Sequence, residues 1–74
     1  MPHVNIKHFP APLNEEQASE LVSAITEAVT KAFGCTEDVV SIALEPVERQ
    51  AWQDQVYAPE IVERKHLLHK TPSY

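Results

Sequence analysis

The start of the chain, Met1-Pro2, is the sequence feature with the most distinctive chemistry. An initiator methionine before a small proline is commonly removed, which would leave Pro2 with a free secondary amine. An ordinary α-amino group titrates near pH 7.7–8.0, and burial in an apolar site lowers that value. A base whose pKa lies near the working pH suits proton transfer. Proline at position 2 is common in any protein, so the hypothesis that Pro2 is a general base needs support from the rest of the chain.

The other reactive side chains favour no catalytic or metal site. Cys35 is the only cysteine and is followed by Thr36-Glu37-Asp38, and these carboxylates disfavour a reactive thiolate. His3 and His8 point to opposite faces if they lie on a strand. His66 and His69 could share a helix face, but two ligands do not make a zinc site. We therefore expect no bound metal and interpret Cys35 as a small, half-buried residue.

Trp52, the only tryptophan, has two interpretations from the sequence. It could pack in the core, as most tryptophans do. It also lies in a polar stretch, residues 48–54, and a lone aromatic in such surroundings often lines a pocket or an interface. The sequence leaves both interpretations open.

Length and composition limit what the chain can be. Its 74 residues carry 11 acidic and 6 basic side chains, a net charge of −5, which argues against nucleic acid or an anionic membrane as the main partner. No apolar run approaches the roughly 20 residues that span a bilayer. The N-terminus also lacks the basic and apolar regions of a signal peptide. We expect one domain, residues 1–74, in a cytoplasmic protein.

The elements that would position Pro2 follow a strand–helix–strand order. Residues 3–9 alternate as a strand does, and Pro10 and Pro12 end it. A helix is predicted over residues 14–33, because apolar residues recur every three or four positions between the cap Asn14 and the stop Gly34. The β-branched run Val39–Leu44 predicts a second strand. Two strands joined by a helix form a βαβ unit with parallel strands.

The C-terminal segment and the sheet face that the helix leaves uncovered are the remaining parts of the predicted fold. Residues 46–57 could hold one or two helical turns, residues 57–59 look like a break, and Pro59 suits the start of another short helix. One helix covers only one face of a two-stranded sheet, and so short a chain gains little stability from its own core. Another copy of the chain could cover the second face, so we expect a homo-oligomer.

The order of these segments resembles the 4-oxalocrotonate tautomerase family. The resemblance rests on residues 1–7, on the cap at 14–17, on 25–29 within the helix, and on 40–45 in the second strand. The segments around Trp52, 56–61 and 67–74 are similar to the longer-tailed, PptA-like branch. The resemblance implies βαβ subunits that pair as homodimers, with hexamers as the other assembly. It also implies a cofactor-free tautomerase whose catalytic base is Pro2.

The resemblance also implies a substrate pocket and reveals two departures. Trp52 falls at the family's active-site aromatic, and we expect Trp52, Phe9 and Ser41 to line the substrate pocket, partly from a neighbouring subunit. The family's two substrate-binding arginines are absent, because Ala11-Pro12-Leu13 and Ser41 stand at their places. A two-arginine clamp on a dicarboxylate is therefore not expected. A monoanionic or aromatic keto acid such as phenylpyruvate fits better, and Arg49, Arg64 or Lys65 could supply one cation.

Two other functions are compatible with the same sequence. A non-catalytic, oligomeric interaction module could keep the fold without the activity. The amine of Pro2 could also serve another reaction, by forming an iminium or by activating water in a hydratase or dehalogenase.

Overall fold

A computed structural model describes the whole chain, Met1 to Tyr74. Its regular elements are two strands, one long α-helix and a helical tail. In chain order they are β1 (His3–His8), α1 (Glu15–Phe33), η1 (Glu37–Val39), β2 (Ser41–Pro46), η2 (Arg49–Ala51), η3 (Gln53–Val62) and η4 (Lys65–Leu67). The two strands pair in parallel. The predicted βαβ unit with a helical C-terminal tail is confirmed.

Helix α1 begins and ends as its sequence predicts. The Asn14 side chain accepts a hydrogen bond from the Gln17 backbone N–H at 2.8 Å, and the Gln17 side chain accepts one from the Asn14 N–H at 3.1 Å. This reciprocal capping box satisfies two backbone donors that the first turn leaves free. At the other end Gly34 takes the left-handed conformation, with φ 64°. A residue without a Cβ adopts that conformation with little strain.

The second strand begins later than its sequence predicts. We expected it over residues 39–44, whereas β2 runs from Ser41 to Pro46. Val39 instead closes the tight turn η1, because its N–H bonds back to the Thr36 carbonyl at 3.4 Å. The register pairs His3 with Ser41 and His8 with Pro46, so the length of β1 sets where β2 ends.

The tail contains one continuous helix where the sequence predicted a break at residues 57–59. Helix η3 passes through Pro59 as a π-helix, whose N–H groups bond to carbonyls five positions back. Proline removes one donor from such a helix. The ladder nevertheless continues beyond it, since the Glu63 N–H reaches the Ala58 carbonyl at 3.0 Å. The helix break that the sequence predicted from Pro59 at residues 57–59 is therefore wrong.

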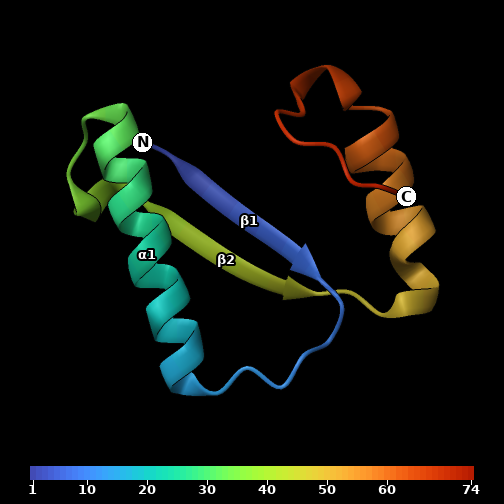
Figure 1. The fold of residues 1–74 in the computed structure, drawn as a ribbon, viewed down its shortest axis with the longest axis horizontal. Helices are drawn as coiled ribbons and strands as arrows, with labels where there is room; N and C mark the ends of the chain where they lie inside the picture. Colours follow the sequence, from blue (N-terminus) through green and yellow to red (C-terminus); the bar gives the residue numbers. More distant parts are fainter.

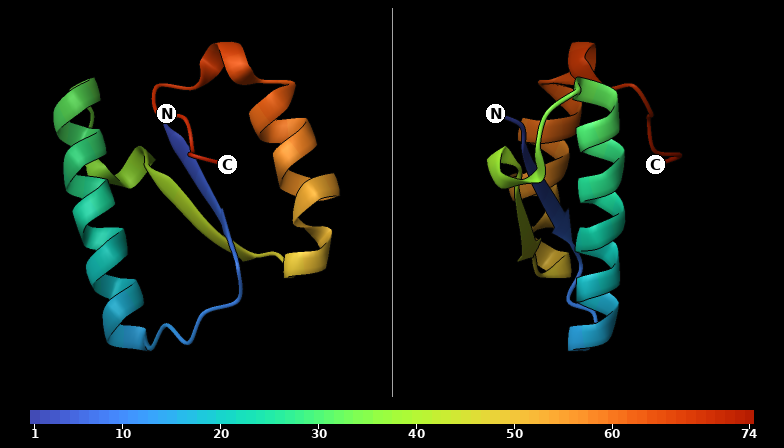
Figure 2. Two further views of the ribbon diagram at one scale, coloured as in Figure 1. Left: turned by 45° about the vertical axis from the view of Figure 1, so that its right-hand side comes forward. Right: turned by 90° about the vertical axis from the view of Figure 1, so that its left-hand side faces the viewer.

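The strands lie between the long helix and the tail. Figure 1 shows α1 on the left, the two strands in the middle and η3 on the right, and the left view of Figure 2 keeps this order. Val4 of β1 shares a cavity with Val29 and Phe33 at the end of α1. Asn5, on the opposite face of β1, shares another cavity with Val56 of η3. The tail thus approaches the sheet face that α1 leaves free.

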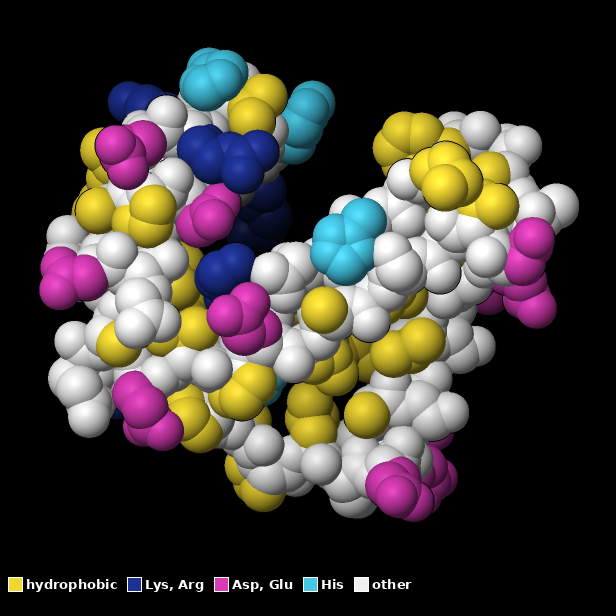
Figure 3. Space-filling view, turned by 180° about the vertical axis from the view of Figure 1, so that it is seen from behind, with side chains coloured by type: hydrophobic (Ala, Val, Ile, Leu, Met, Phe, Trp, Pro, Cys, Tyr) yellow, Lys and Arg dark blue, Asp and Glu magenta, His cyan; other side chains and the backbone are white.

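Very little of this single chain is buried. Only Val47 and Val56 fall to 4% and 5% exposure, and no residue of α1 is fully buried. Seen from behind, hydrophobic side chains lie open between the strands and the helical parts on either side (Figure 3). No helix is long and apolar enough to cross a bilayer.

Candidate active site

Pro2 lies at the entrance of β1, beside an apolar cavity. The cavity has a volume of about 510 Å³, which is within the usual range for small-molecule sites, and Pro2 is half-buried at its edge. Its hydrophobic walls come from β1 and from the last turns of α1, and its lining residues are Met1, Pro2, His3, Val4, Val29, Phe33 and Cys35. The parallel crossover places the end of α1 beside the start of β1, which is why these distant residues meet.

Ser41 lies next to Pro2, as the register of the strands requires. The Ser41 backbone N–H donates to the Pro2 carbonyl at 3.2 Å. The Ser41 hydroxyl lies 2.6 Å from Nδ1 of His3, so these two side chains are hydrogen-bonded directly beside Pro2. The structure therefore brings together Pro2 and Ser41, two of the residues expected in the site. It adds His3, which the sequence analysis did not place in the site.

Phe9 and Trp52 meet at the opposite end of β1. Their rings pack edge to face, with centroids 4.9 Å apart and planes 75° apart. The Arg49 guanidinium lies over the Phe9 ring, 4.4 Å from its centroid. Such cation–π contacts are favourable because the ring face carries negative charge density. Phe9 and Trp52 are thus brought together as expected, and Arg49 is the candidate cation that lies beside them.

A second cavity, of 420 Å³, opens at this aromatic pair. Its walls are almost entirely apolar, and its lining residues are Lys7, His8, Phe9, Trp52 and Tyr74. Trp52 therefore lies at a pocket and not in the core, which decides between the two interpretations that its sequence allowed. Tyr74 was not predicted as a pocket residue. The one feature of the sequence that could have indicated it is that it is an aromatic residue in the tail.

The two halves of the expected site do not meet within one chain. Pro2 precedes β1 and Phe9 follows it, so the six residues of the strand separate them by roughly 20 Å. Pro2 and Trp52 accordingly line different cavities. We expected the pocket walls to come partly from a neighbouring subunit. Within one chain, Phe9 and Trp52 share a cavity, whereas Pro2 and Ser41 lie together at the other end of β1.

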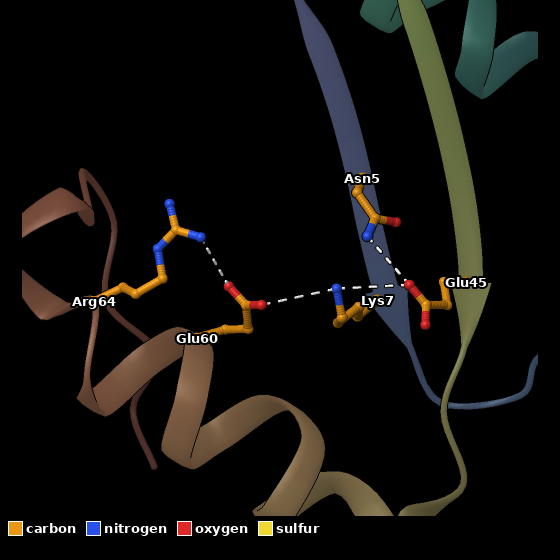
Figure 4. Close-up of polar contacts among 5 residues, drawn as sticks. All are labelled: Asn5, Lys7, Glu45, Glu60 and Arg64. Atoms are coloured by element: carbon orange, nitrogen blue, oxygen red, sulfur yellow. Dashed lines mark hydrogen bonds and ion pairs between the residues drawn. The ribbon is translucent and has the colours of Figure 1, made fainter.

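A chain of polar contacts connects the sheet to the tail through Lys7, which also lines the aromatic cavity. Figure 4 shows it running from the tail to β1 and on to β2. Lys7 Nζ lies 3.5 Å from a Glu45 oxygen and 3.9 Å from a Glu60 oxygen, and Arg64 lies 3.4 Å from Glu60. The Asn5 amide donates to Glu45 at 3.1 Å. This bond and the Lys7 charge hold the pKa of Glu45 below its ordinary value of 4.5.

The remaining candidate residues lie apart from each other. Arg64 forms an ion pair with Glu60, and Lys65 lines a third cavity within the tail. His66 and His69 lie in and after η4, far along the chain from Cys35. No group of three side chains with metal-ligating chemistry comes together anywhere in the chain.

Comparison with known proteins identifies the class that this fold and these residues define. A family model described as tautomerase enzyme matches residues 2–57, which span both strands, α1 and the Trp52 segment. The chain belongs to the tautomerase family, and it is a tautomerase, an isomerase that interconverts tautomers.

Relatives that match over the full length place the chain more closely. Proteins named tautomerase PptA are similar to it at 43% identity in Klebsiella pneumoniae, 40% in an Enterobacter species and 35% in Pectobacterium carotovorum. Each match covers 100% of this chain and 97% of the relative. The resemblance to the PptA-like branch is therefore confirmed, tail included.

Proposed function

We propose that this protein interconverts the keto and enol forms of a monoanionic, aromatic keto acid such as phenylpyruvate, with Pro2 as the general base. One observation carries the proposal: in a chain of the tautomerase family, Pro2 lies half-buried at the edge of an apolar cavity. No cofactor takes part in the proposed reaction.

The surroundings of Pro2 suit an amine that must stay uncharged. Removal of Met1 frees the imino nitrogen, and Met1 is 97% exposed, so its bond to Pro2 is accessible. Apolar walls from Val4, Val29 and Phe33 then disfavour the ammonium form. A neutral secondary amine keeps the lone pair that accepts a proton.

The proposed reaction has two proton transfers. Neutral Pro2 takes the proton from the enol hydroxyl, and the negative charge is shared between that oxygen and the carbon next to the developing carbonyl. The carbon then takes the proton back from the Pro2 nitrogen, which gives the keto form and restores the base. Donors beside Pro2 would stabilise the charge on oxygen, and Ser41 and His3 are the nearest polar side chains there.

We propose that a second copy of the chain completes the site. Pro2 and the Phe9–Trp52 pair line cavities at opposite ends of β1, so one chain presents two half-sites. Nearly all apolar side chains remain partly exposed, which favours association of two copies as a homodimer. Pro2 of one copy would then face Phe9 and Trp52 of the other.

The substrate class follows from the charge and the walls of the aromatic half-site. Phe9 and Trp52 provide apolar ring faces, and Arg49 is in none of the ion pairs of the structure. One free guanidinium suits one carboxylate. An aromatic monoacid fits these groups better than a dicarboxylate.

The test replaces Pro2 by alanine, which keeps a terminal amine but makes it primary. We expect kcat/KM for phenylpyruvate ketonisation to fall by about 100-fold, in the range of general-base contributions. Intact-mass measurement on both proteins first establishes that Met1 is absent. Pro12→Ala is the matched control, because Pro12 is an exposed proline outside every cavity.

The proposal is overturned if Pro2→Ala retains wild-type activity, or if the mature wild-type protein keeps Met1 and is nevertheless active. In the second case the Pro2 nitrogen is an amide without a basic lone pair, and another group must be the base.

A further inference from the structure

We infer that Tyr74 is a specificity-determining residue, whose ring forms one wall of the aromatic cavity and selects substrates that carry an aryl ring. This inference rests on the proposed function, since it concerns which keto acids the same site prefers. Three observations carry it: a hydrogen bond to Trp52, a ring contact with Tyr57, and the composition of the cavity.

The hydrogen bond holds Tyr74 at the mouth of the cavity. Trp52 Nε1–H donates to the Tyr74 hydroxyl oxygen at 3.3 Å, although 22 residues separate the two along the chain. Figure 1 shows the last segment running back along η3, which brings Tyr74 to this position. The bond fixes the phenol end of Tyr74 against the indole that lines the cavity.

Tyr57 supports the Tyr74 ring from the tail side. The two ring centroids lie 5.8 Å apart, with planes 38° apart, which is within the range of favourable aromatic pairs. Tyr57 itself lines only the neighbouring cavity within the tail, whereas Tyr74 lines both. Tyr57 therefore supports the wall, and Tyr74 is the tyrosine that faces the aromatic cavity.

The cavity has the size and lining that an aryl group requires. Its 420 Å³ lies within the usual range for small-molecule sites, and three of its five lining residues are the aromatics Phe9, Trp52 and Tyr74. A bound aryl ring can meet each of them edge to face or offset, the arrangements that aromatic pairs prefer. Tyr74 is 64% exposed, so its ring has free surface for such a contact.

The test compares an aromatic substrate with a short aliphatic one. Enolisation of phenylpyruvate and of 2-oxobutanoate is followed in heavy water by deuterium uptake at the carbon beside the carbonyl. In Tyr74→Ala we expect kcat/KM for phenylpyruvate to fall about tenfold and that for 2-oxobutanoate by less than about twofold. Tyr74→Phe keeps the ring, so we expect less than about a threefold loss for either substrate.

A matched control separates the ring from a general disturbance of the tail. Leu67 is an exposed tail residue that lines no cavity, so Leu67→Ala should leave both substrates unaffected. Equal losses of kcat/KM for the two substrates in Tyr74→Ala would overturn the inference, because a merely structural role would affect substrates with and without an aryl group alike. A loss in Tyr74→Phe as large as in Tyr74→Ala would also overturn it, since the hydroxyl would then carry the effect.

A binding measurement keeps this inference distinguishable from the proposed reaction. Trp52 is the only tryptophan, so its fluorescence reports ligands in this cavity. 3-Phenylpropanoate has the aryl ring and the carboxylate but no carbonyl to enolise. Its dissociation constant should rise about tenfold in Tyr74→Ala and stay within about threefold in Tyr74→Phe. An unchanged constant in Tyr74→Ala overturns the role of Tyr74, whereas full activity in Pro2→Ala contradicts only the proposed base.

Discussion

At the scale of single residues, two cations near the aromatic cavity differ in what they can bind. Lys7 lies between Glu45 and Glu60, so its charge is already balanced by two carboxylates. Arg49 lies on the Phe9 ring and has no carboxylate partner. A guanidinium on an aromatic face keeps donors at its edge for an anion. Arg49 is therefore the residue we expect to hold the substrate carboxylate.

Replacing Arg49 by glutamine should raise KM for phenylpyruvate about tenfold, with a smaller change in kcat, because a charge-assisted hydrogen bond to the substrate is lost. Steady-state kinetics measure both constants. Arg64→Gln is the matched control, since Arg64 lies on the far side of Glu60 and should leave KM unchanged. A rise in KM that is equal in the two variants would contradict the role of Arg49.

Glu45 makes the stability of the protein depend on pH. Its pKa in the folded chain lies below 4.5, first because Asn5 donates a hydrogen bond to it and then because Lys7 is close. A lowered pKa stabilises the folded state above the unfolded-state value, and this contribution is lost as the pH falls through the folded value. We expect the free energy of unfolding to decrease below about pH 4.5, and less steeply in Glu45→Gln. Urea unfolding at several pH values measures this, and parallel pH profiles of the two proteins would exclude it.

At the scale of elements, local sequence signals decide α1 but not the tail. The cap Asn14, the apolar period and the stop Gly34 all lie within one segment, so they predict the helix without knowledge of the fold. Helix η3 has no such signals at its ends, and Pro59 suggests a break inside it. Its contact with the sheet is made by Lys7 and Glu60, which are far apart in the sequence. A tertiary contact of this kind cannot be recognised from the local pattern.

The capping box gives a prediction for α1. Asn14→Ala removes the acceptor for the Gln17 N–H, and we expect the free energy of unfolding to fall by about 1 kcal/mol. Chemical denaturation followed by circular dichroism measures the change. Ser19→Ala serves as the control, because Ser19 is an exposed residue within α1 and its replacement should not destabilise the protein. Equal stability of Asn14→Ala and wild type would show that the cap does not contribute to stability.

At the scale of the whole molecule, one copy of the chain buries too little to account for a stable fold. Two of its 74 residues are buried, and Phe33 remains 73% exposed at the Pro2 cavity. A chain of this length usually needs a disulfide, a metal or association with another copy. Cys35 is the only cysteine, so an internal disulfide is excluded. We therefore expect the protein to be a dimer in solution, as the sequence also predicts.

Association through the α1 side of the sheet can be tested at Phe33. We expect Phe33→Asp to raise the dimer dissociation constant at least about tenfold, because a large apolar side chain is replaced by a charge at the contact. Analytical ultracentrifugation measures the constant. Ala24→Asp introduces the same charge on the opposite side of α1 and should have little effect. A wild-type protein that stays monomeric at all concentrations would contradict both the dimer and the two-copy site.

The amino-acid sequence by itself determined the parallel βαβ unit, the limits of α1 and the family, because these depend on local period, caps and segment order. It also indicated Pro2, Ser41, Phe9 and Trp52 as candidates. Only the tertiary structure decided that Ser41 lies beside Pro2, that Phe9 meets Trp52 at the other end of β1, and that Tyr74 returns to the same cavity. The physical reason is that strand register, chain reversal and side-chain packing bring together residues whose separation along the chain carries no local signal.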